Sequence, residues 1–212
     1  MKHEKRDDIN FYNGDNMEFM KGVPDKFYDL AIIDPPYGIN INHNMGRRKG
    51  DKKSTYKKAI WDTETPSEMF FKEIFRVSEN QIIWGGNYFL EFLKSTPCFI
   101  MWDKQFSEDL SFAQFEMAWT SFKSSSKKIE LHPSNIKNRT HPTQKPIKLY
   151  RWLLQNYAKK GDKILDTHGG SMTHAIACDM EGYDLDIIEI DEDYFNDGLK
   201  AFDNHKRQLT LF

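Results

Sequence analysis

The tetrapeptide Asp34-Pro35-Pro36-Tyr37 is the strongest chemical signal in the sequence, and it directly follows the apolar residues 30–33. In a sheet of parallel strands, ligands bind beyond the carboxyl ends of the strands, so this tetrapeptide lies where chemistry is expected. Two prolines fix the backbone and leave carbonyl oxygens free to accept hydrogen bonds. Asp34 and the Pro35 carbonyl could accept the hydrogens of an exocyclic amine on a planar base, and Tyr37 could stack on its ring. A proline-rich turn capped by Asp34 is the alternative interpretation.

A second signal is a strand followed by a glycine-containing turn, in residues 163–171, with a helical pattern after it. This order brings a backbone close to a cofactor. About twenty residues further on, Glu189 ends another apolar stretch, and an acid in that place commonly bonds ribose hydroxyls. The pattern G-x-G-x-x-G is absent from the sequence, which argues against a dinucleotide. The alternative is that Glu189 is an exposed acid among many neighbouring acids.

The net charge of −2 hides a strong asymmetry along the chain. Residues 44–58 hold seven lysines and arginines against one acid, and residues 123–151 hold eight against one. Residues 162–203, in contrast, hold twelve acids against two lysines. Basic blocks are typical either of a solvated face or of a phosphate-binding surface. In the second case, Arg47, Arg48, Lys52 and Lys53, in the long polar loop 38–59, are the candidate phosphate-binding residues.

The elements that must position these residues alternate between apolar strands and helical patterns, which predicts an α/β sheet with helices on both faces. Two short stretches within 99–122 lack a clear crossover helix and could pair antiparallel at one edge. We therefore predict a single three-layer domain over residues 1–212 with a mostly parallel, seven-stranded sheet. The expected strands are 9–12, 29–33, 81–84, 99–102, 116–122, 163–166 and 185–189, and the expected helices are 67–77, 88–94, 146–158, 172–181 and 193–205.

Composition restricts the class of protein further. Hydrophobic residues make up 39% of the 212 residues and aromatic residues 14%, which is enough to close a core and excludes disorder for most of the chain. No apolar run approaches the length of a membrane span, and the first residues lack the apolar stretch of a signal peptide. Cys98 and Cys178 cannot form a disulfide framework. We expect a soluble cytoplasmic protein.

Together these motifs resemble those of bacterial and phage DNA amino-methyltransferases that use S-adenosylmethionine. Their order resembles that of the beta group, in which D-P-P-Y precedes the cofactor-binding turn. The similarity covers most of residues 9–205. The matching segments are Asn13-Gly14-Asp15 for a short acidic motif, residues 34–37 for the catalytic motif, residues 81–89, His141-Pro142-Thr143-Gln144-Lys145-Pro146 for H-P-T-x-K-P, residues 166–173 for the first cofactor motif and Glu189 for its ribose-binding acid.

The resemblance implies a Rossmann-like methyltransferase fold with a circularly permuted order of motifs. It also implies methyl transfer to N6 of adenine in DNA, because aspartate in the catalytic motif is mostly an adenine signature in this family. The target base would flip out of the duplex to react. N4 of cytosine, an RNA base, and a catalytically degenerate nucleic-acid-binding module are the alternatives. The implied residues are Asp34, Pro35, Pro36 and Tyr37 for catalysis, and Asp15, Thr143, Lys145, Asp166, Gly169, Ser171 and Glu189 for the cofactor.

The sequence departs from the family pattern at the first cofactor motif, whose usual form is D-P-F-x-G-S-G-T. Thr167 and His168 replace Pro-Phe, which bears on the apolar support of the cofactor. Met172 replaces a glycine, so the next helix would begin at a slightly different distance from the methionine moiety. The presumed target-recognition stretch, residues 103–139, is short, which suggests a short site or loose specificity.

Three histidines, His141, His168 and His174, raise the question of a metal site, and His174 and Cys178 have helical i,i+4 spacing. The sequence contains neither C-x-x-C nor H-E-x-x-H, so we expect no metal. Methyl transfer from a sulfonium requires none.

The tail 208–212 carries three large apolar side chains after a polar helical pattern. Such residues usually fold back onto the core or serve a partner. The tail resembles the Q-L-x-L-F peptide by which bacterial replication and repair proteins dock on the sliding clamp. In that interpretation Gln208 and Leu209 anchor one pocket, and Leu211 and Phe212 fill another. Packing on the protein's own sheet is the alternative.

Overall fold

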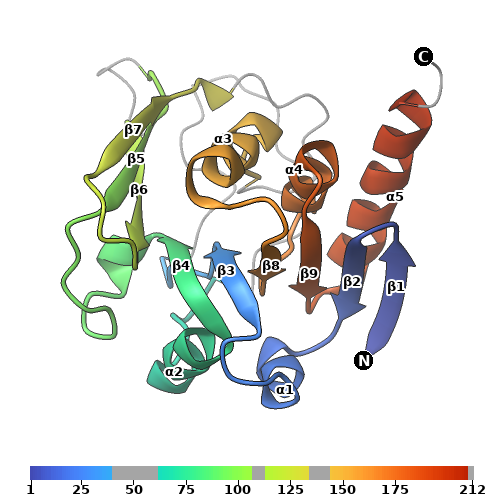
Figure 1. Ribbon diagram of the computed structural model, residues 1–212, viewed down its shortest axis with the longest axis horizontal. Coiled ribbons are helices and arrows are strands. Elements are labelled where there is room, and N and C mark those ends of the chain that lie inside the picture. Colours follow the sequence, from blue (N-terminus) through green and yellow to red (C-terminus); the bar gives the residue numbers. More distant parts are fainter. Residues whose placement is uncertain (40–61, 107–112, 134–143, 210–212) are drawn as a thin grey trace.

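The computed structural model describes residues 1–39, 62–106, 113–133 and 144–209, and one mixed sheet organises them (Figure 1). The strands are β1 (Lys2–Arg6), β2 (Ile9–Asn13), β3 (Tyr28–Ile33), β4 (Ser78–Trp84), β5 (Phe99–Asp103), β6 (Phe115–Thr120), β7 (Lys127–Glu130), β8 (Lys163–Asp166) and β9 (Asp184–Glu189). The helices are α1 (Asn16–Lys21), α2 (Glu68–Val77), α3 (Ile147–Tyr157), α4 (Thr173–Glu181) and α5 (Glu192–Leu209), with a 3-10 helix, η1 (Gly86–Tyr88).

Within the described residues the strands lie in the order β1-β2-β9-β8-β3-β4-β6-β5-β7. The run from β2 through β9, β8 and β3 to β4 is parallel, as is the pair β5–β7. The pairs β1–β2, β4–β6 and β5–β6 are antiparallel. The predicted α/β fold is confirmed, and so is the antiparallel pairing of the two strands within residues 99–122.

The predicted count of seven strands is wrong, because the part of the chain that the structure describes already forms a sheet of nine. The two additional strands, β1 and β7, form its two edges, so β7 rather than the antiparallel pair closes that side. Both strands are rich in lysine, arginine and glutamate, and most of their side chains are exposed or half-buried. Edge strands commonly carry charge, and a search for apolar runs therefore misses them.

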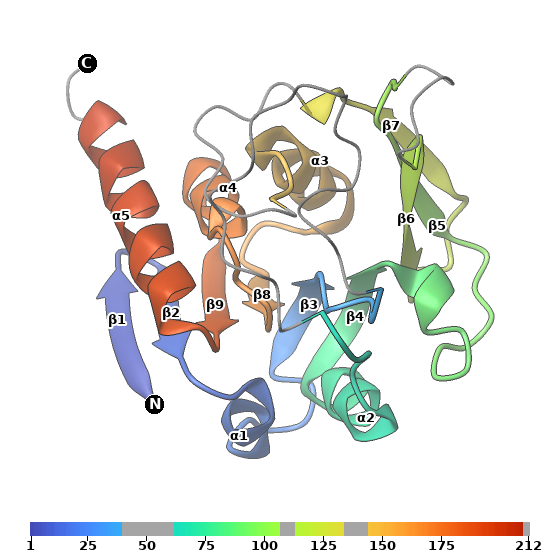
Figure 2. The ribbon, with the colours of Figure 1, turned by 180° about the vertical axis from the view of Figure 1, so that it is seen from behind.

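Helices cover both faces of the central strands, because both faces are apolar. In β3, Leu30 and Ile32 belong to one buried cluster, and Ala31 and Ile33 belong to the other. This division follows from the alternation of side chains along a strand. Figures 1 and 2 show α1 and α2 on one side of the sheet and α3, α4 and α5 on the other. The predicted three layers are present in the described residues.

The helix predicted over residues 88–94 is absent; the chain instead forms the short 3-10 helix η1 and a series of turns. Phe89 and Leu93 are both buried, and their spacing of four residues imitates a helical pattern. The backbone bonds here span three residues, from Tyr88 N to Gly85 O and from Phe92 N to Phe89 O. In contrast, α1 was not predicted, because six residues are too few for a periodic signal.

The sheet brings the two ends of the sequence to one place. The late strands β8 and β9 lie between the early strands β2 and β3, so Asn13 is the direct partner of Glu189. Because these strands are parallel, their carboxyl ends share one edge of the sheet, and both chemical signals of the sequence lie there. Among the residues described, no helix is long and apolar enough to cross a membrane.

Candidate active site

Asp34 follows the carboxyl end of β3, and both of its carboxylate oxygens have partners in the fold. The Tyr37 hydroxyl donates a hydrogen bond to Asp34 Oδ1 over 2.6 Å. The Lys145 ammonium lies 2.5 Å from Asp34 Oδ2. Asp34 is therefore held in one orientation at the point where the sequence places the catalytic motif.

Lys145 carries a buried positive charge at the centre of the site. Its side chain is 3% exposed, and its Nζ lies between Asp34 Oδ2 and Glu116 Oε2, the latter at 3.3 Å. The same ammonium lies 5.1 Å from the ring centroid of Trp84 and 5.9 Å from that of Tyr37. Lys145 directly precedes Pro146, the N-cap of α3, so the start of that helix positions it. The resemblance assigns Lys145 to the cofactor, whereas the structure places its ammonium against the catalytic motif.

Glu116 is a site residue that the sequence analysis missed. It lies on β6, and its Oε1 is 2.5 Å from the ammonium of Lys104, which follows β5. No motif surrounds Glu116, and its one signal in the sequence is that it is the single acid in a mostly apolar strand. Lys104 and Glu116 both belong to residues 103–139, the presumed target-recognition stretch. Through Lys145, the structure places this stretch beside the motif of residues 34–37.

The charges of this cluster influence one another because they are close and largely buried. Burial raises the pKa of Asp34 above its ordinary value, although Lys145 opposes this shift. Burial by itself would lower the pKa of Lys145, but Asp34 and Glu116 outweigh it and raise that pKa. Burial would likewise raise the pKa of Glu116, yet Lys145 and Lys104 hold it below its ordinary value. Two carboxylates and two ammonium groups therefore balance one another.

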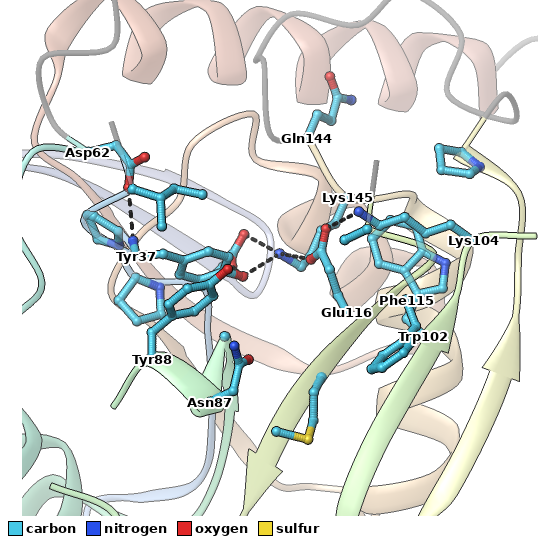
Figure 3. Close-up of a pocket in the computed structure, with 18 of the residues that line it drawn as sticks. Tyr37, Asp62, Asn87, Tyr88, Trp102, Lys104, Phe115, Glu116, Gln144 and Lys145 are labelled. Carbon is cyan, nitrogen blue, oxygen red and sulfur yellow. Dashed lines mark hydrogen bonds and ion pairs between the residues drawn. The ribbon is translucent and has the colours of Figure 1, made fainter. Parts of the chain in front are cut away.

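A cavity of about 740 Å³ opens beside this cluster, and Figure 3 shows the side chains that line it. The rings of Tyr37 and Tyr88 are stacked within it, with centroids 5.0 Å apart and planes 14° from parallel. Aromatic walls and a carboxylate suit a flat, polar ring system. The lining comprises Asp34, Pro35, Pro36, Tyr37, Ile39, Asp62, Gly85, Asn87, Tyr88, Trp102, Lys104, Phe106, Ala113, Phe115, Glu116, Met117, Pro133, Gln144 and Lys145.

Gly85 and Asp62 fix the position of Tyr37 from two sides. Asp62 Oδ1 accepts the backbone N–H of Tyr37 over 2.9 Å and that of Gly38 over 3.1 Å. Gly85 is left-handed, with φ 68°, and a Cβ on it would lie 2.2 Å from the Tyr37 ring. Only glycine allows the ring to approach this closely.

The glycine-containing turn after β8 is built on Asp166, which is almost completely buried. Its Oδ1 accepts the backbone N–H of His168 over 3.0 Å, and its Oδ2 lies 2.9 Å from Nδ1 of His174. The Thr173 hydroxyl donates to the Lys145 carbonyl over 3.0 Å, which ties this turn to the catalytic motif. Asp166 therefore shapes the turn through its own hydrogen bonds.

Glu189 anchors the rest of the turn from the end of β9. Its Oε2 accepts the Gly170 N–H over 2.6 Å, and its Oε1 accepts the Asp191 N–H over 2.8 Å. Burial raises the pKa of Glu189 to about 7, against the effect of these two donors. Ile190, the next residue, is 68% exposed, which is unusual for a large apolar side chain beside a buried acid.

Three further predicted cofactor residues, Asp15, Gly169 and Ser171, lie on the same edge of the sheet. Asp15 is exposed and caps α1, since its Oδ1 accepts the Glu18 N–H over 2.9 Å. The loop that carries Asp15 contacts the end of β9, because Gly14 N donates to the Glu189 carbonyl over 3.1 Å. Gly169 N donates to the Ile188 carbonyl, and the Ser171 hydroxyl lies near that of Thr173. Thr143, Arg47, Arg48, Lys52 and Lys53 lie outside the described residues.

The departures from the family pattern fit into this core. Met172 has a left-handed backbone, with φ 56°, and its side chain is fully buried. The left-handed conformation costs about 1–2 kcal/mol of folding free energy. Burial of the side chain stabilises the fold by about 1.5–3 kcal/mol and so offsets that cost. Burial lowers the pKa of His168 to about 4, so its ring is neutral near pH 7. That ring packs edge-on against Phe70, as an apolar aromatic residue would.

Among the residues described, no three histidine, cysteine or acidic side chains form a possible metal site.

Solved structures with a similar fold are DNA methyltransferases. M1.HpyAVI in complex with S-adenosylmethionine is 20% identical over 91% of this chain and 99% of that one, with a TM-score of 0.59. The PvuII DNA methyltransferase, described as cytosine-N4-specific, is 13% identical over 92% and 85%, with a TM-score of 0.64. A putative DNA modification methylase from Thermus thermophilus, complexed with S-adenosylmethionine, is 14% identical over 92% and 95%, with a TM-score of 0.59. The fold is thus that of this class of enzyme.

The sequence profile of the DNA methylase family, which covers N6 and N4 enzymes, matches residues 83–200. The match includes more than half of the sequence, and the chain belongs to this family. S-adenosylmethionine is the methyl donor that the family uses. No curated protein matches the sequence significantly.

Replacing Gly85 by alanine should displace Tyr37 and slow methyl transfer by about 100-fold, the cost of a misplacement of about 1 Å. Gly182 offers a matched control, because it is also left-handed, with φ 75°, but a Cβ there meets nothing within 4 Å. Single-turnover rates of the Gly85→Ala and Gly182→Ala variants check this expectation. Equal rates in the two variants would show that contact with Tyr37 is unimportant.

Proposed function

We propose that this chain transfers a methyl group from S-adenosylmethionine to N6 of adenine in DNA, as a member of the beta group with permuted motifs. The observation that carries the proposal is Asp34, fixed by Tyr37 and Lys145 at the mouth of an aromatic cavity. An exocyclic amine entering this cavity would find acceptors in the Asp34 carboxylate and, as the motif implies, in the carbonyl of Pro35, which also lines the cavity. A base reaches such a cavity only after it has flipped out of the duplex.

The residues at the ends of β2 and β9 fit the nucleoside part of the donor. Glu189 has both oxygens engaged by backbone N–H groups, yet each carboxylate oxygen can accept a second hydrogen bond from a ribose hydroxyl. Exposed Ile190 offers an apolar surface to a purine ring, and exposed Asp15 offers an acceptor. When bound, S-adenosylmethionine would supply an electrophilic methyl group on a sulfonium.

The protein contributes mainly orientation to this reaction. Asp34 is an acceptor for an amine hydrogen, and Lys145 stabilises its charged form. Holding the amine in line with its target accounts for most of the rate that such a site supplies. Asp34 thus aligns and polarises the amine rather than acting as a strong base.

N4 of cytosine is the second candidate target, because adenine and cytosine present the same amine on a ring. The similar fold of the cytosine-N4-specific PvuII enzyme favours this alternative. Incubation with labelled S-adenosylmethionine and mixed DNA, followed by nucleoside analysis, separates the two products. Label in N6-methyl-2′-deoxyadenosine supports the proposal, and label in N4-methyl-2′-deoxycytidine replaces it by the alternative.

Asp34→Ala should lower the single-turnover rate of methyl transfer by at least about 100-fold, because an oriented acceptor is lost. Affinity for S-adenosylmethionine should change little, since Asp34 contacts Tyr37 and Lys145 rather than the turn at Glu189. Asp25→Ala, at an exposed acid paired with Arg76, is the control. Normal turnover by the Asp34→Ala variant would remove Asp34 from the mechanism.

Affinity for S-adenosylmethionine should fall as the pH drops below about 7, the pKa to which burial raises Glu189. The ionised carboxylate accepts the ribose hydroxyls, so its protonation removes an acceptor, up to tenfold in affinity per pH unit. Calorimetric titrations between pH 6 and 8 measure this, with Glu189→Gln and, as the control, Glu192→Gln at an exposed neighbour. A pH dependence that persists unchanged in Glu189→Gln would assign it to another group.

We also propose that the basic loop 38–59 binds DNA phosphates, although residues 40–61 lie outside the described part of the chain. Neutralising Arg47, Arg48, Lys52 and Lys53 to glutamine should weaken binding to any sequence. In a plot of the logarithm of the binding constant against the logarithm of the salt concentration, the slope should become less steep by about 0.9 for each phosphate contact removed. Lys72→Gln/Lys200→Gln, at exposed lysines, is the control. An unchanged slope would mean that the loop is a solvated face.

Docking of the tail on a sliding clamp stays a proposal from the resemblance. Gln208 is exposed near the end of α5, which reaches Leu209, and residues 210–212, with Leu211 and Phe212, lie outside the described part.

A further inference from the structure

A row of alternating charges crosses the cavity wall from the catalytic motif to the recognition stretch. It begins at Asp34, continues through Lys145 to Glu116 and ends at Lys104. Figure 3 shows Glu116 between the two lysines, with its carboxylate facing both. The family motifs account for Asp34 and Lys145, whereas Glu116 and Lys104 belong to no motif of the sequence.

The distances show that Lys145 is shared unequally between two carboxylates. Its Nζ is 2.5 Å from Asp34 Oδ2 and 3.3 Å from Glu116 Oε2. Glu116 Oε2 has no hydrogen-bond partner of ordinary geometry, while its Oε1 is taken by Lys104 at 2.5 Å. A buried cation this close to a single carboxylate lowers the basicity of that carboxylate and so weakens it as an acceptor for an amine hydrogen.

We propose that Glu116, held by Lys104, is a positioning residue that shares the Lys145 ammonium with Asp34 and so limits how strongly that ammonium acts on Asp34. Asp34 then stays basic enough to accept a hydrogen from the target amine. This role rests on the proposed methyl transfer and adds two residues to it. Lys104 neutralises part of the charge of Glu116 and so weakens its attraction for Lys145. The ion pair between Lys145 and Asp34 therefore stays closed.

The electrostatics of the cluster give the two variants opposite expected effects. Glu116 raises the pKa of Asp34, so removing its charge should lower that pKa. Lys104 neutralises part of Glu116, so removing Lys104 should let Glu116 act more strongly and raise the pKa of Asp34. Neither variant changes the other titratable or charged groups around Asp34. These groups are Lys145, Tyr37, Tyr150 and, behind Tyr37, Asp62.

The test compares the pH dependence of single-turnover methyl transfer in the wild type, Glu116→Gln and Lys104→Gln, with S-adenosylmethionine saturating at every pH so that protonation of Glu189 does not set the acidic limb. The acidic limb should move to lower pH in Glu116→Gln and to higher pH in Lys104→Gln, each by about one pH unit. Carbon-13 NMR titration of the Asp34 carboxyl, assigned with Asp34→Asn, should show the same two directions without any turnover. Glu181→Gln is a matched control, because Glu181 is also half-buried and paired with a basic residue, Arg151.

Shifts in the same direction, or no shift in either variant while the wild type transfers methyl groups, would overturn this inference alone. A wild type that transfers none, although it binds S-adenosylmethionine, would overturn the proposed function and this role with it. The melting temperature would show whether Glu116→Gln unfolds. In that case the Lys104→Gln variant alone tests the inference, which requires the acidic limb of its pH–rate profile to move to higher pH. A merely structural role for the pair predicts lower stability but no opposite displacement of the two pH profiles.

Discussion

The buried charge of Lys145 is the constraint on which the site depends. An ammonium group without water is strongly unfavourable unless carboxylates compensate it, so at least one acid must face it. Asp34 comes from the end of β3, Glu116 from β6 and Lys145 from the residue before Pro146. Three segments far apart in the sequence are thereby brought to one point, and the cavity forms beside them.

The order of the strands has a comparable role for the other part of the site, which lies at the carboxyl ends of β2, β8 and β9. Insertion of β8 and β9 between β2 and β3 makes Asn13 the neighbour of Glu189 and places the turn after β8 next to Asp34's strand. The bond from the Thr173 hydroxyl to the Lys145 carbonyl then joins the two halves. Because this link is direct, a displacement of the turn would be transmitted to Lys145 and so to Asp34.

The altered first cofactor motif is compatible with an intact site. Met172, which stands where the usual pattern has a glycine, adopts the left-handed conformation that favours glycine, and its side chain fills the space beside Gly169 and Gly198. His168 is kept neutral by burial and packs as an aromatic residue would. The residues that depart from the usual pattern are thus accommodated within the core of this chain.

The sequence by itself determined the α/β class, the central strands and the two motifs at their ends, because buried parallel strands read as apolar runs and D-P-P-Y is a local signal. It did not reveal β1 and β7, whose charged residues carry no such pattern, nor the true turns of residues 88–94. Only the tertiary structure decided that Glu116 and Lys104 belong to the site and that Lys145 faces Asp34. The physical reason is that a charge pair between distant segments depends on strand order and helix placement, which leave no periodic or local mark in the sequence.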